Sequence, residues 1–349
     1  MAMRRILRFL LRSLLVVIAL CGVLAVLFVY LVYTPPSDVP HLSGTVTKGS
    51  IIVDGLPRTY RTYAPRGLAK GASLVVVMHG SGENGGQIRV GTGYGFDRLA
   101  DAHGFAVVYP DAYQGYWDVC SVVGAVSVKG LKIDDVRFLT GLADKLVAEI
   151  GVDPSRVFAV GGSRGGSMAL RLALEAPSRF RAVAAVSASV PTPENFQCKP
   201  AGHGTSSVMI MNGTEDPIVP FNGGDVNLLG FFYRNGKVRS SRGSAQYFAD
   251  LNNIAGTPET RETRVADGVR VEQVLWRNHS NVEVELVAIH GGGHGIPQPY
   301  RRRPRILGPS VKEPNGPAMI WSFFDRQRAA LSAKTKGNHR DTESTEGSL

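Results

Sequence analysis

The sequence predicts an α/β fold with a mostly parallel central sheet, covered by helices on both faces and preceded by one N-terminal transmembrane helix. Three observations support this class. Short apolar runs of strand length alternate with helical segments along most of the 349 residues. These runs are apolar at nearly every position, as expected of strands that are buried on both faces. Before them, residues 14–32 form an unbroken apolar segment without a charge, about the length that spans a bilayer as a helix.

The N-terminal segment is interpreted as a membrane anchor. Four basic residues precede the apolar run: Arg4, Arg5, Arg8 and Arg12. By the positive-inside rule they keep this end in the cytoplasm, so that the rest of the chain lies outside it. Tyr30 and Tyr33 lie near the far end of the run, where aromatic residues favour the membrane interface. The alternative is secretion after cleavage of a signal peptide near Ala25, but the apolar stretch continues to Val32.

The composition divides the chain into five parts. Residues 1–12 form a basic cytoplasmic N-terminus, and residues 13–33 form the transmembrane signal-anchor. Residues 34–43, with two consecutive prolines, are expected to be a stiff linker. Residues 44–332 form the α/β domain, and the polar residues 333–349 are expected to be a disordered tail because they lack an apolar period.

Local patterns predict the elements of the α/β domain in order. A hairpin is expected from the alternating polarity on both sides of Asp54 and Gly55. Buried strands are predicted at residues 74–78, 105–109, 157–160, 182–187, 207–211 and 282–289. Helices are predicted at residues 96–103, 134–150 and 318–331. In the second of these helices, Asp134 or Asp135 can cap the start and Gly151 the end.

Four glycines surround a single serine in the segment VFAVGGSRGGSMALRL, residues 157–172. An apolar strand precedes the glycines and good helix formers follow them. Gly161 to Gly165 therefore fit the G-x-S-x-G nucleophile elbow, in which Ser163 has a strained backbone and its neighbours must be small. The alternative is a glycine-rich turn that cradles a phosphate at the start of the helix.

A nucleophilic serine needs a base and a carboxylate, and these follow in the order Ser, Asp or Glu, His, each after a strand. Asp216 lies in the loop after one buried strand, with Glu215 as the competing carboxylate. His294 follows the last strand beyond three glycines, whereas His290 at the strand end is expected to be structural. An intact set argues against the alternative of a catalytically silent, tethered binding module.

The same chemistry needs two backbone N–H groups that stabilise an oxyanion. One is expected from Arg164, the residue after the nucleophile. The other is expected from Ser81, with Gly82 as the alternative, in the glycine-rich turn after the strand at residues 74–78. Neither a cofactor nor a metal is expected to take part.

Taken together, these motifs resemble the α/β-hydrolase esterases that include polyhydroxybutyrate depolymerases and feruloyl or acetylxylan esterases. The matching segments are residues 53–60, 78–82, 134–139, 161–165, 212–216, 219–221, 291–294 and 320–324. The resemblance implies a serine carboxylic-ester hydrolase with Ser163, Asp216 and His294 as the triad. It also implies that Trp117 lies near the acyl pocket, the alternative being a core aromatic residue.

Two departures from the family leave the substrate open. Arg164 stands where such enzymes often have Asn or Ala, and the loop at residues 230–241, with three aromatic residues, is individual to this chain. The expected substrate is a small or oligomeric ester, such as a hydroxyalkanoate oligomer or a feruloyl, acetyl or other short acyl ester. Solid polymer is not expected, since the sequence has no separate polymer-binding domain. A serine peptidase of the same fold is the near alternative.

The cysteines and the remaining charge support two further expectations. Cys21 lies in the anchor, so Cys120 and Cys198 are expected to form a disulfide outside the cytoplasm, the alternative being two partly buried thiols. The formal net charge is +10, and part of it lies in Arg301, Arg302, Arg303 and Arg305. This cluster is interpreted as a solvated loop, and no nucleic-acid partner is expected because aromatic stacking residues are missing beyond Tyr300.

Overall fold

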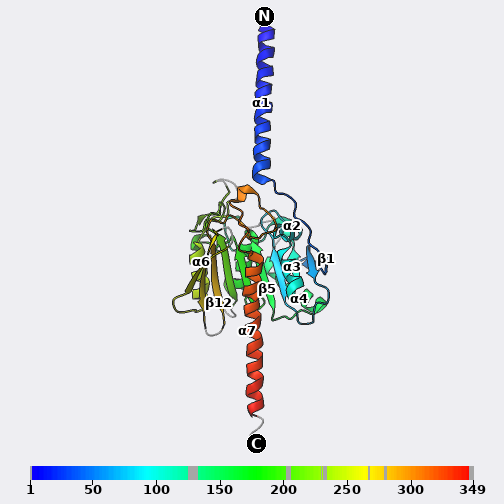
Figure 1. Cartoon of the computed structure of the whole chain (residues 1–349), viewed down its shortest axis with the longest axis vertical. Helices are drawn as coiled ribbons and strands as arrows, with labels where there is room; N and C mark the ends of the chain where they lie inside the picture. Colours follow the sequence, from blue (N-terminus) through cyan, green and yellow to red (C-terminus); the bar gives the residue numbers. More distant parts are fainter. Residues whose placement is uncertain are drawn as a thin grey trace.

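A ten-stranded sheet forms the centre of the computed structural model (Figure 1). The structure describes residues 2–124, 133–201, 206–228, 230, 234–265, 268–278 and 281–345. The strands of the sheet are β1 (Thr45–Val53), β2 (Leu56–Ala64), β3 (Leu74–Met78), β4 (Ala106–Pro110), β5 (Val157–Gly162), β6 (Ala182–Val186), β7 (Ser207–Gly213), β10 (Glu259–Arg264), β11 (Arg270–Arg277) and β12 (Glu283–Ile289). A separate two-stranded sheet pairs β8 (Gly224–Asp225) with β9 (Lys237–Val238).

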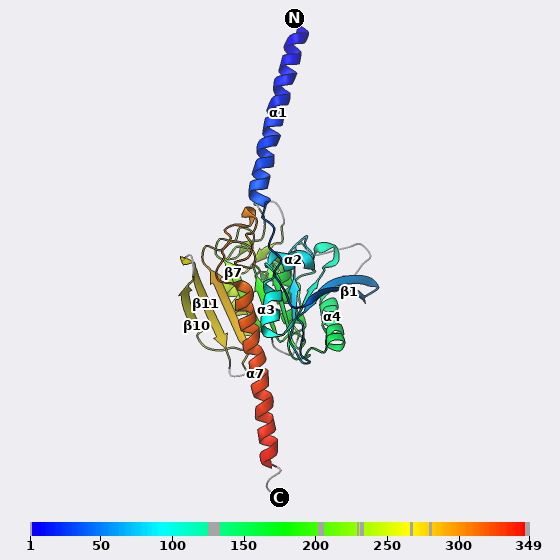
Figure 2. The same ribbon diagram turned by 45° about the vertical axis from the view of Figure 1, so that its right-hand side comes forward.

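The helices precede, cover and extend beyond the sheet. They are α1 (Ala2–Val32), α2 (Gly85–Gly91), α3 (Gly95–His103), α4 (Asp135–Ile150), α5 (Arg164–Glu175), α6 (Ser241–Leu251) and α7 (Gly316–Thr345). Short 3₁₀ turns are η1 (Tyr113–Gly115), η2 (Pro193–Asn195) and η4 (Arg305–Leu307). Figures 1 and 2 show α1 leaving the domain at one end and α7 extending beyond it at the other.

The strand order is β1-β2-β4-β3-β5-β6-β7-β12-β11-β10. The strands from β4 to β12 in this order pair in parallel, and antiparallel strands complete both edges. Because parallel strands have their carboxyl ends at one edge of a sheet, the loops after β3, β5, β7 and β12 meet at the same end of the domain. The predicted fold class is therefore confirmed, with an N-terminal apolar helix before it.

Two hydrophobic cores, one on each face of the sheet, account for the apolar strands. In β3, Leu74, Val76 and Met78 face the core that contains residues of α4, α5 and α6. Val75 and Val77 face the opposite core, to which α3 and α7 contribute. Since successive side chains of a strand point to opposite faces, a central strand between two helical layers must be apolar at every position.

The boundaries of α4 settle which aspartate caps it. Asp134 accepts a hydrogen bond from the backbone N–H of Arg137 at 2.9 Å, and Gly151 ends the helix with φ of 70°. Asp135 is buried instead, and its carboxylate lies 2.6 Å from the guanidinium of Arg58 on β2. The first turn of α4 is thereby joined to the N-terminal hairpin.

A disulfide joins Cys120 to Cys198, which are separated by 78 positions in the sequence. Backbone hydrogen bonds accompany it, from Gln197 N–H to Cys120 O and from Val122 N–H to Asn195 O, both at 2.9 Å. The bond connects the loop after η1 to the loop after η2, and it joins the two cysteines that were expected to pair. Cys21 in α1 is free and exposed.

Several elements differ from the prediction. The segments of α2, α6, β10 and β11 were not predicted; β10 has the sequence ETRETR and is exposed along its whole length, so it shows no apolar alternation. The disordered tail expected at residues 333–349 is wrong for residues 333–345, which continue α7. A helix that is already formed can extend at little cost over proline-free residues, because only the first turn requires nucleation. Residues 346–349 lie outside the described part of the chain.

The apolar helix α1 stands apart from the domain. Met3–Val32 is long and apolar enough to cross a membrane, and none of the segment is buried against the rest of the chain. Where α1 ends, it approaches the loop that contains η4: the guanidinium of Arg305 donates to the carbonyl of Tyr30 at 2.9 Å and lies 4.1 Å from the centre of its ring. The helix therefore leaves the domain beside this loop (Figure 1).

Candidate active site

Ser163 lies in a sharp turn between β5 and α5. Its φ and ψ are 54° and −122°, in the left-handed half of the backbone map where residues with a Cβ are strained. The turn is held by a hydrogen bond from the Ser163 N–H to the carbonyl of Val186 on the neighbouring strand, at 2.8 Å. The backbone of an elbow is thus present, with the serine at the carboxyl end of a central strand.

Three of the four glycines around Ser163 are required by close approach. A Cβ on Gly161 would lie 2.2 Å from the backbone of Gly165, and one on Gly165 would lie 2.4 Å from the carbonyl of Met78. A Cβ on Gly166 would meet its nearest neighbour at 2.8 Å. Gly162 differs, since its nearest contact would be 3.9 Å away. Gly161, Gly165 and Gly166 therefore let α5 pack directly on the sheet beneath the serine.

His294 and Asp216 come together from the loops after β12 and β7. The Nδ1 of His294 lies 2.8 Å from Oδ2 and 3.0 Å from Oδ1 of Asp216, and both residues are buried. The carboxylate also accepts hydrogen bonds from the backbone N–H groups of Ile218 and Val219, at 2.8 and 2.9 Å. A carboxylate can only accept, so Nδ1 carries the proton and Nε2 is left as the basic nitrogen.

The environment keeps Asp216 ionised. Burial favours the neutral acid and raises the pKa of Asp216. The opposing effects of His294 and of the backbone N–H groups of Ile218 and Val219 are larger together and lower that pKa below its usual value. The negative charge beside His294 therefore orients the ring and stabilises its protonated form.

The competing residues lie elsewhere. Glu215 is exposed, and its backbone N–H donates to the carbonyl of Gly292 at 2.9 Å. His290 remains at the end of β12, where its ring lies 2.9 Å from the guanidinium of Arg270 and 3.5 Å from Glu272. The sequence-based choice between the two carboxylates and between the two histidines thus agrees with the geometry.

The two backbone N–H groups expected to stabilise an oxyanion, those of Ser81 and Arg164, lie near Ser163: Ser81 lines the same cavity and Arg164 is the next residue in the chain. Ser81 lines the cavity next to the serine, whereas the N–H of Gly82 is already bonded to the carbonyl of Gly115 at 2.9 Å. The engaged N–H of Gly82 makes this alternative the weaker one. Arg164 is the first residue of α5, a position where the N–H has no acceptor within the helix.

The side chain of Arg164 does not line the cavity that contains Ser163 and His294. It is buried, and its guanidinium donates to the carbonyls of Trp117 at 2.6 Å and Gly124 at 2.8 Å. The charge of Arg164 therefore does not lie at the mouth of the cavity. Arg164 instead holds the loop at residues 117–124 against the elbow helix.

Trp117 is a core residue and does not line the cavity. Its side chain is fully buried, its Nε1–H donates to the carbonyl of His79 at 2.9 Å, and its ring packs on Phe138. The assignment of Trp117 to the acyl pocket is therefore wrong. The indole instead stabilises the turn that contains Ser81, through its hydrogen bond to His79. The adjacent Tyr116 lines the cavity in its place.

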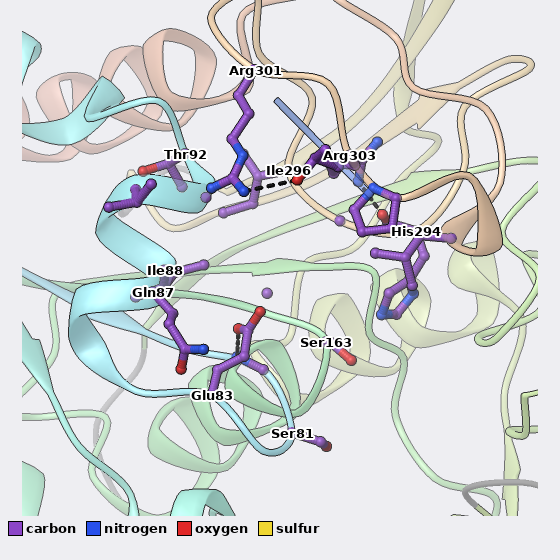
Figure 3. Close-up of a pocket in the computed structure, with 18 of the residues that line it drawn as sticks. Ser81, Glu83, Gln87, Ile88, Thr92, Ser163, His294, Ile296, Arg301 and Arg303 are labelled. Carbon is purple, nitrogen blue, oxygen red and sulfur yellow. Dashed lines mark hydrogen bonds between the residues drawn. The ribbon is translucent and has the colours of Figure 1, made fainter. Parts of the chain in front are cut away.

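A cavity of about 640 Å³ opens above Ser163. Figure 3 shows the imidazole of His294 and the hydroxyl of Ser163 on the same side of this cavity, with Ser81 below them. Residues of α2 form one wall, and the segment from His294 to Leu307 forms the other. The pocket-lining residues that sequence reasoning missed include Glu83, Gln87, Tyr116, Ile296, Arg301 and Arg303. Phe231, Phe232 and Tyr233, noted in the sequence, lie outside the described residues.

The family model described as Esterase PHB depolymerase matches residues 58–218. A protein of Nocardia uniformis subsp. tsuyamanensis named "Putative esterase NocK" is 30% identical over 301 residues, which cover 80% of this chain and 83% of that protein. Poly(3-hydroxyalkanoate) depolymerase C of Paucimonas lemoignei is 26% identical over 263 residues, which cover 67% of this chain and 58% of that protein.

A solved structure shows the same fold. The acetyl xylan esterase from Aspergillus awamori superposes with a TM-score of 0.52 and 17% sequence identity, over 72% of this chain and 95% of that chain. At this identity the likeness concerns the fold alone.

Proposed function

The chain belongs to the Esterase PHB depolymerase family of carboxylic-ester hydrolases, and from this premise we propose that Ser163, His294 and Asp216 are its catalytic triad. One observation carries the proposal. A serine with strained backbone and a histidine bonded to a buried carboxylate line one cavity, at the carboxyl ends of parallel strands. These are the parts that an acyl-transfer reaction requires.

The reaction proceeds through an acyl-enzyme. Ser163 Oγ attacks the ester carbonyl while His294 Nε2 takes the hydroxyl proton, and the charge that develops on the carbonyl oxygen is stabilised by the N–H groups of Ser81 and Arg164. His294 then gives its proton to the departing alkoxide, and the alcohol leaves. A water molecule, deprotonated by the same nitrogen, attacks the acyl-enzyme and releases the acid, and the proton returns to Ser163. Asp216 remains ionised throughout and stabilises the imidazolium.

The proposed substrates are short acyl esters and short hydroxyacid oligomers. The cavity, at about 640 Å³, is of the size that holds a small molecule. It also lies beside the end of α1, since Thr34 contributes to its lining. A solid polymer granule would have to approach a site that is held close to a membrane, whereas small esters and oligomers diffuse to it.

The test of this function uses the full chain in a neutral detergent. We expect turnover of 4-nitrophenyl butyrate and of hydroxybutyrate oligomers, with little clearing of a suspension of solid polyhydroxybutyrate. The matched 4-nitroanilide is the control for peptidase activity and should be cleaved at least about a hundredfold more slowly, since an amide nitrogen is a poor leaving group. Rapid clearing of the solid polymer without turnover of soluble esters would contradict the proposed substrate class, and faster cleavage of the anilide would contradict the esterase assignment.

We further propose that α1 anchors the protein in a membrane with the α/β domain outside the cytoplasm. The length and apolar character of Met3–Val32, its lack of burial and the four preceding arginines support this orientation. We expect a protein with an epitope at its N-terminus to stay in the membrane pellet after alkaline carbonate washing, with the epitope attached. A soluble form that begins near Val26 and lacks the epitope would contradict the anchor and indicate a cleaved signal.

A further inference from the structure

The arginine-rich loop at residues 301–305 forms part of the cavity above Ser163. Arg301 and Arg303 both line the cavity, whereas Arg302 is exposed and does not. The interpretation of this cluster as a wholly solvated loop is therefore wrong for two of its arginines. Figure 3 shows the side chain of Arg301 reaching into the pocket from above, with Arg303 near His294. Two permanent positive charges thus lie in the same cavity as the nucleophile.

These two charges are poorly compensated. Neither Arg301 nor Arg303 has a carboxylate within ion-pair distance among the described residues. The guanidinium of Arg303 donates to the carbonyl of His294. Burial lowers the pKa of Arg303 to about 10, and the only opposing effect is the more distant charge of Asp216. A guanidinium that is partly buried without a paired anion is costly, and an anionic ligand would relieve that cost.

The acidic residues nearby are already engaged. Glu83 is the one acidic residue that lines the cavity in the described part of the chain, and its carboxylate accepts the backbone N–H of Gly80 at 2.9 Å. Asp216 is bonded to His294 and to two backbone N–H groups. Neither carboxylate forms an ion pair with Arg301 in the described part of the chain, and the guanidinium of Arg301 bonds instead to the neutral hydroxyl of Thr34 at 2.9 Å.

We propose that Arg301 and Arg303 form an anion subsite of the active-site pocket, so that the preferred substrate is an ester that carries a second, negatively charged group. A carboxylate or a phosphate fits, because each accepts several hydrogen bonds from the planar fork of a guanidinium. This inference rests on the proposed esterase function and specifies its substrate class. The anionic ester has two sources, a soluble monoester of a diacid or an acyl ester with an anionic headgroup in the membrane beside α1.

The experiment compares matched esters on the full chain in neutral detergent. One pair places the anion on the acyl side, as mono-4-nitrophenyl adipate against 4-nitrophenyl hexanoate. The other places it on the alcohol side, as 3-carboxyphenyl butyrate against phenyl butyrate. The quantity measured is the ratio of kcat/KM for the anionic and the neutral member. We expect at least one of the two ratios to be about ten or more, which is the effect expected of one charge-assisted hydrogen bond.

The variants attribute this preference to the two arginines. Arg301→Gln should reduce the ratio about tenfold and Arg301→Lys should restore part of it, and Arg303→Gln should also reduce it. Arg302→Gln, which removes an equal charge from the same loop outside the cavity, is the matched control and should keep the wild-type ratio. A general disturbance of the site would lower both rates together and leave the ratio unchanged, so loss of stability cannot imitate the result.

Two outcomes overturn the anion subsite. One is turnover of the neutral esters by the wild type without any preference for the anionic members. The other is a preference that Arg302→Gln reduces as much as Arg301→Gln does. Absence of turnover for every ester would instead contradict the esterase function itself.

A second experiment separates the two sources of the anionic ester by comparing vesicles of phosphatidylglycerol with vesicles of phosphatidylcholine. Selective release of fatty acid from the anionic lipid supports a headgroup. A preference seen with soluble esters alone supports a free monoester.

Discussion

Replacement of Ser163 by alanine is expected to reduce ester hydrolysis to the background rate, a loss of about 10⁵-fold or more in kcat. The hydroxyl is the group that attacks the carbonyl, and water does not replace it at this position. The measurement is the initial rate with 4-nitrophenyl butyrate at saturating concentration. Activity above about one hundredth of the wild-type value would show that Ser163 is not the nucleophile.

The control for this variant is its fold. Alanine keeps the Cβ of serine and therefore the same backbone strain at φ of 54°, and the hydrogen bond from the residue 163 N–H to Val186 is retained. The thermal unfolding midpoint of Ser163→Ala should thus stay close to that of the wild type. A large fall in this midpoint would mean that lost activity reports lost structure, and the Ser163→Cys variant, with a nucleophile at the same place, would then be the comparison.

His294→Ala is expected to lower kcat by about 10⁴-fold or more, because the base that takes the proton of Ser163 is removed. The chain supplies a matched control in His290, which lies four positions earlier in the same loop region and contacts Arg270 and Glu272 instead of the serine. His290→Ala should keep most of the activity and lose at most about 1 kcal/mol of stability, because its polar contacts are partly exposed to solvent.

The opposite pattern would overturn the assignment. If His290→Ala abolished hydrolysis and His294→Ala spared it, the base would be the histidine at the strand end and the bond between His294 and Asp216 would be structural. Equal losses in both variants would point to a fault in the loop as a whole. Both variants should therefore be measured with the same ester and at the same pH.

Much of the fold could be predicted because its signals are local. A strand buried on both faces is apolar throughout, so β3 was bounded correctly at Leu74 and Met78. The two ends of α4 are likewise determined by single residues next to the helix, the capping Asp134 and the left-handed Gly151. The elbow was also visible in the sequence, since Gly161, Gly165 and Gly166 are required where α5 packs closely against the sheet in this chain.

The pocket could not be predicted in the same way, because its walls come from segments far apart in the sequence. Whether Trp117 faces the cavity or the core is decided by its hydrogen bond to His79 and its packing on Phe138, and both residues are far from it in the sequence. The arginine cluster was noted, but which of its members face solvent is decided by the course of the loop over His294. The strand β10 escaped prediction since an exposed edge strand needs no apolar face.

The most direct test of the central claim, that Ser163 is the nucleophile of an acyl-transfer site, is covalent trapping. The full chain is treated with a fluorophosphonate, which reacts with activated serines, and the modified residue is located by mass spectrometry of the digested protein. The proposed mechanism predicts one adduct, on Ser163, formed in step with the loss of ester hydrolysis, absent from Ser163→Ala and formed much more slowly in His294→Ala. Complete inactivation with Ser163 unmodified, or with the adduct on Ser81 or Ser167, would contradict it.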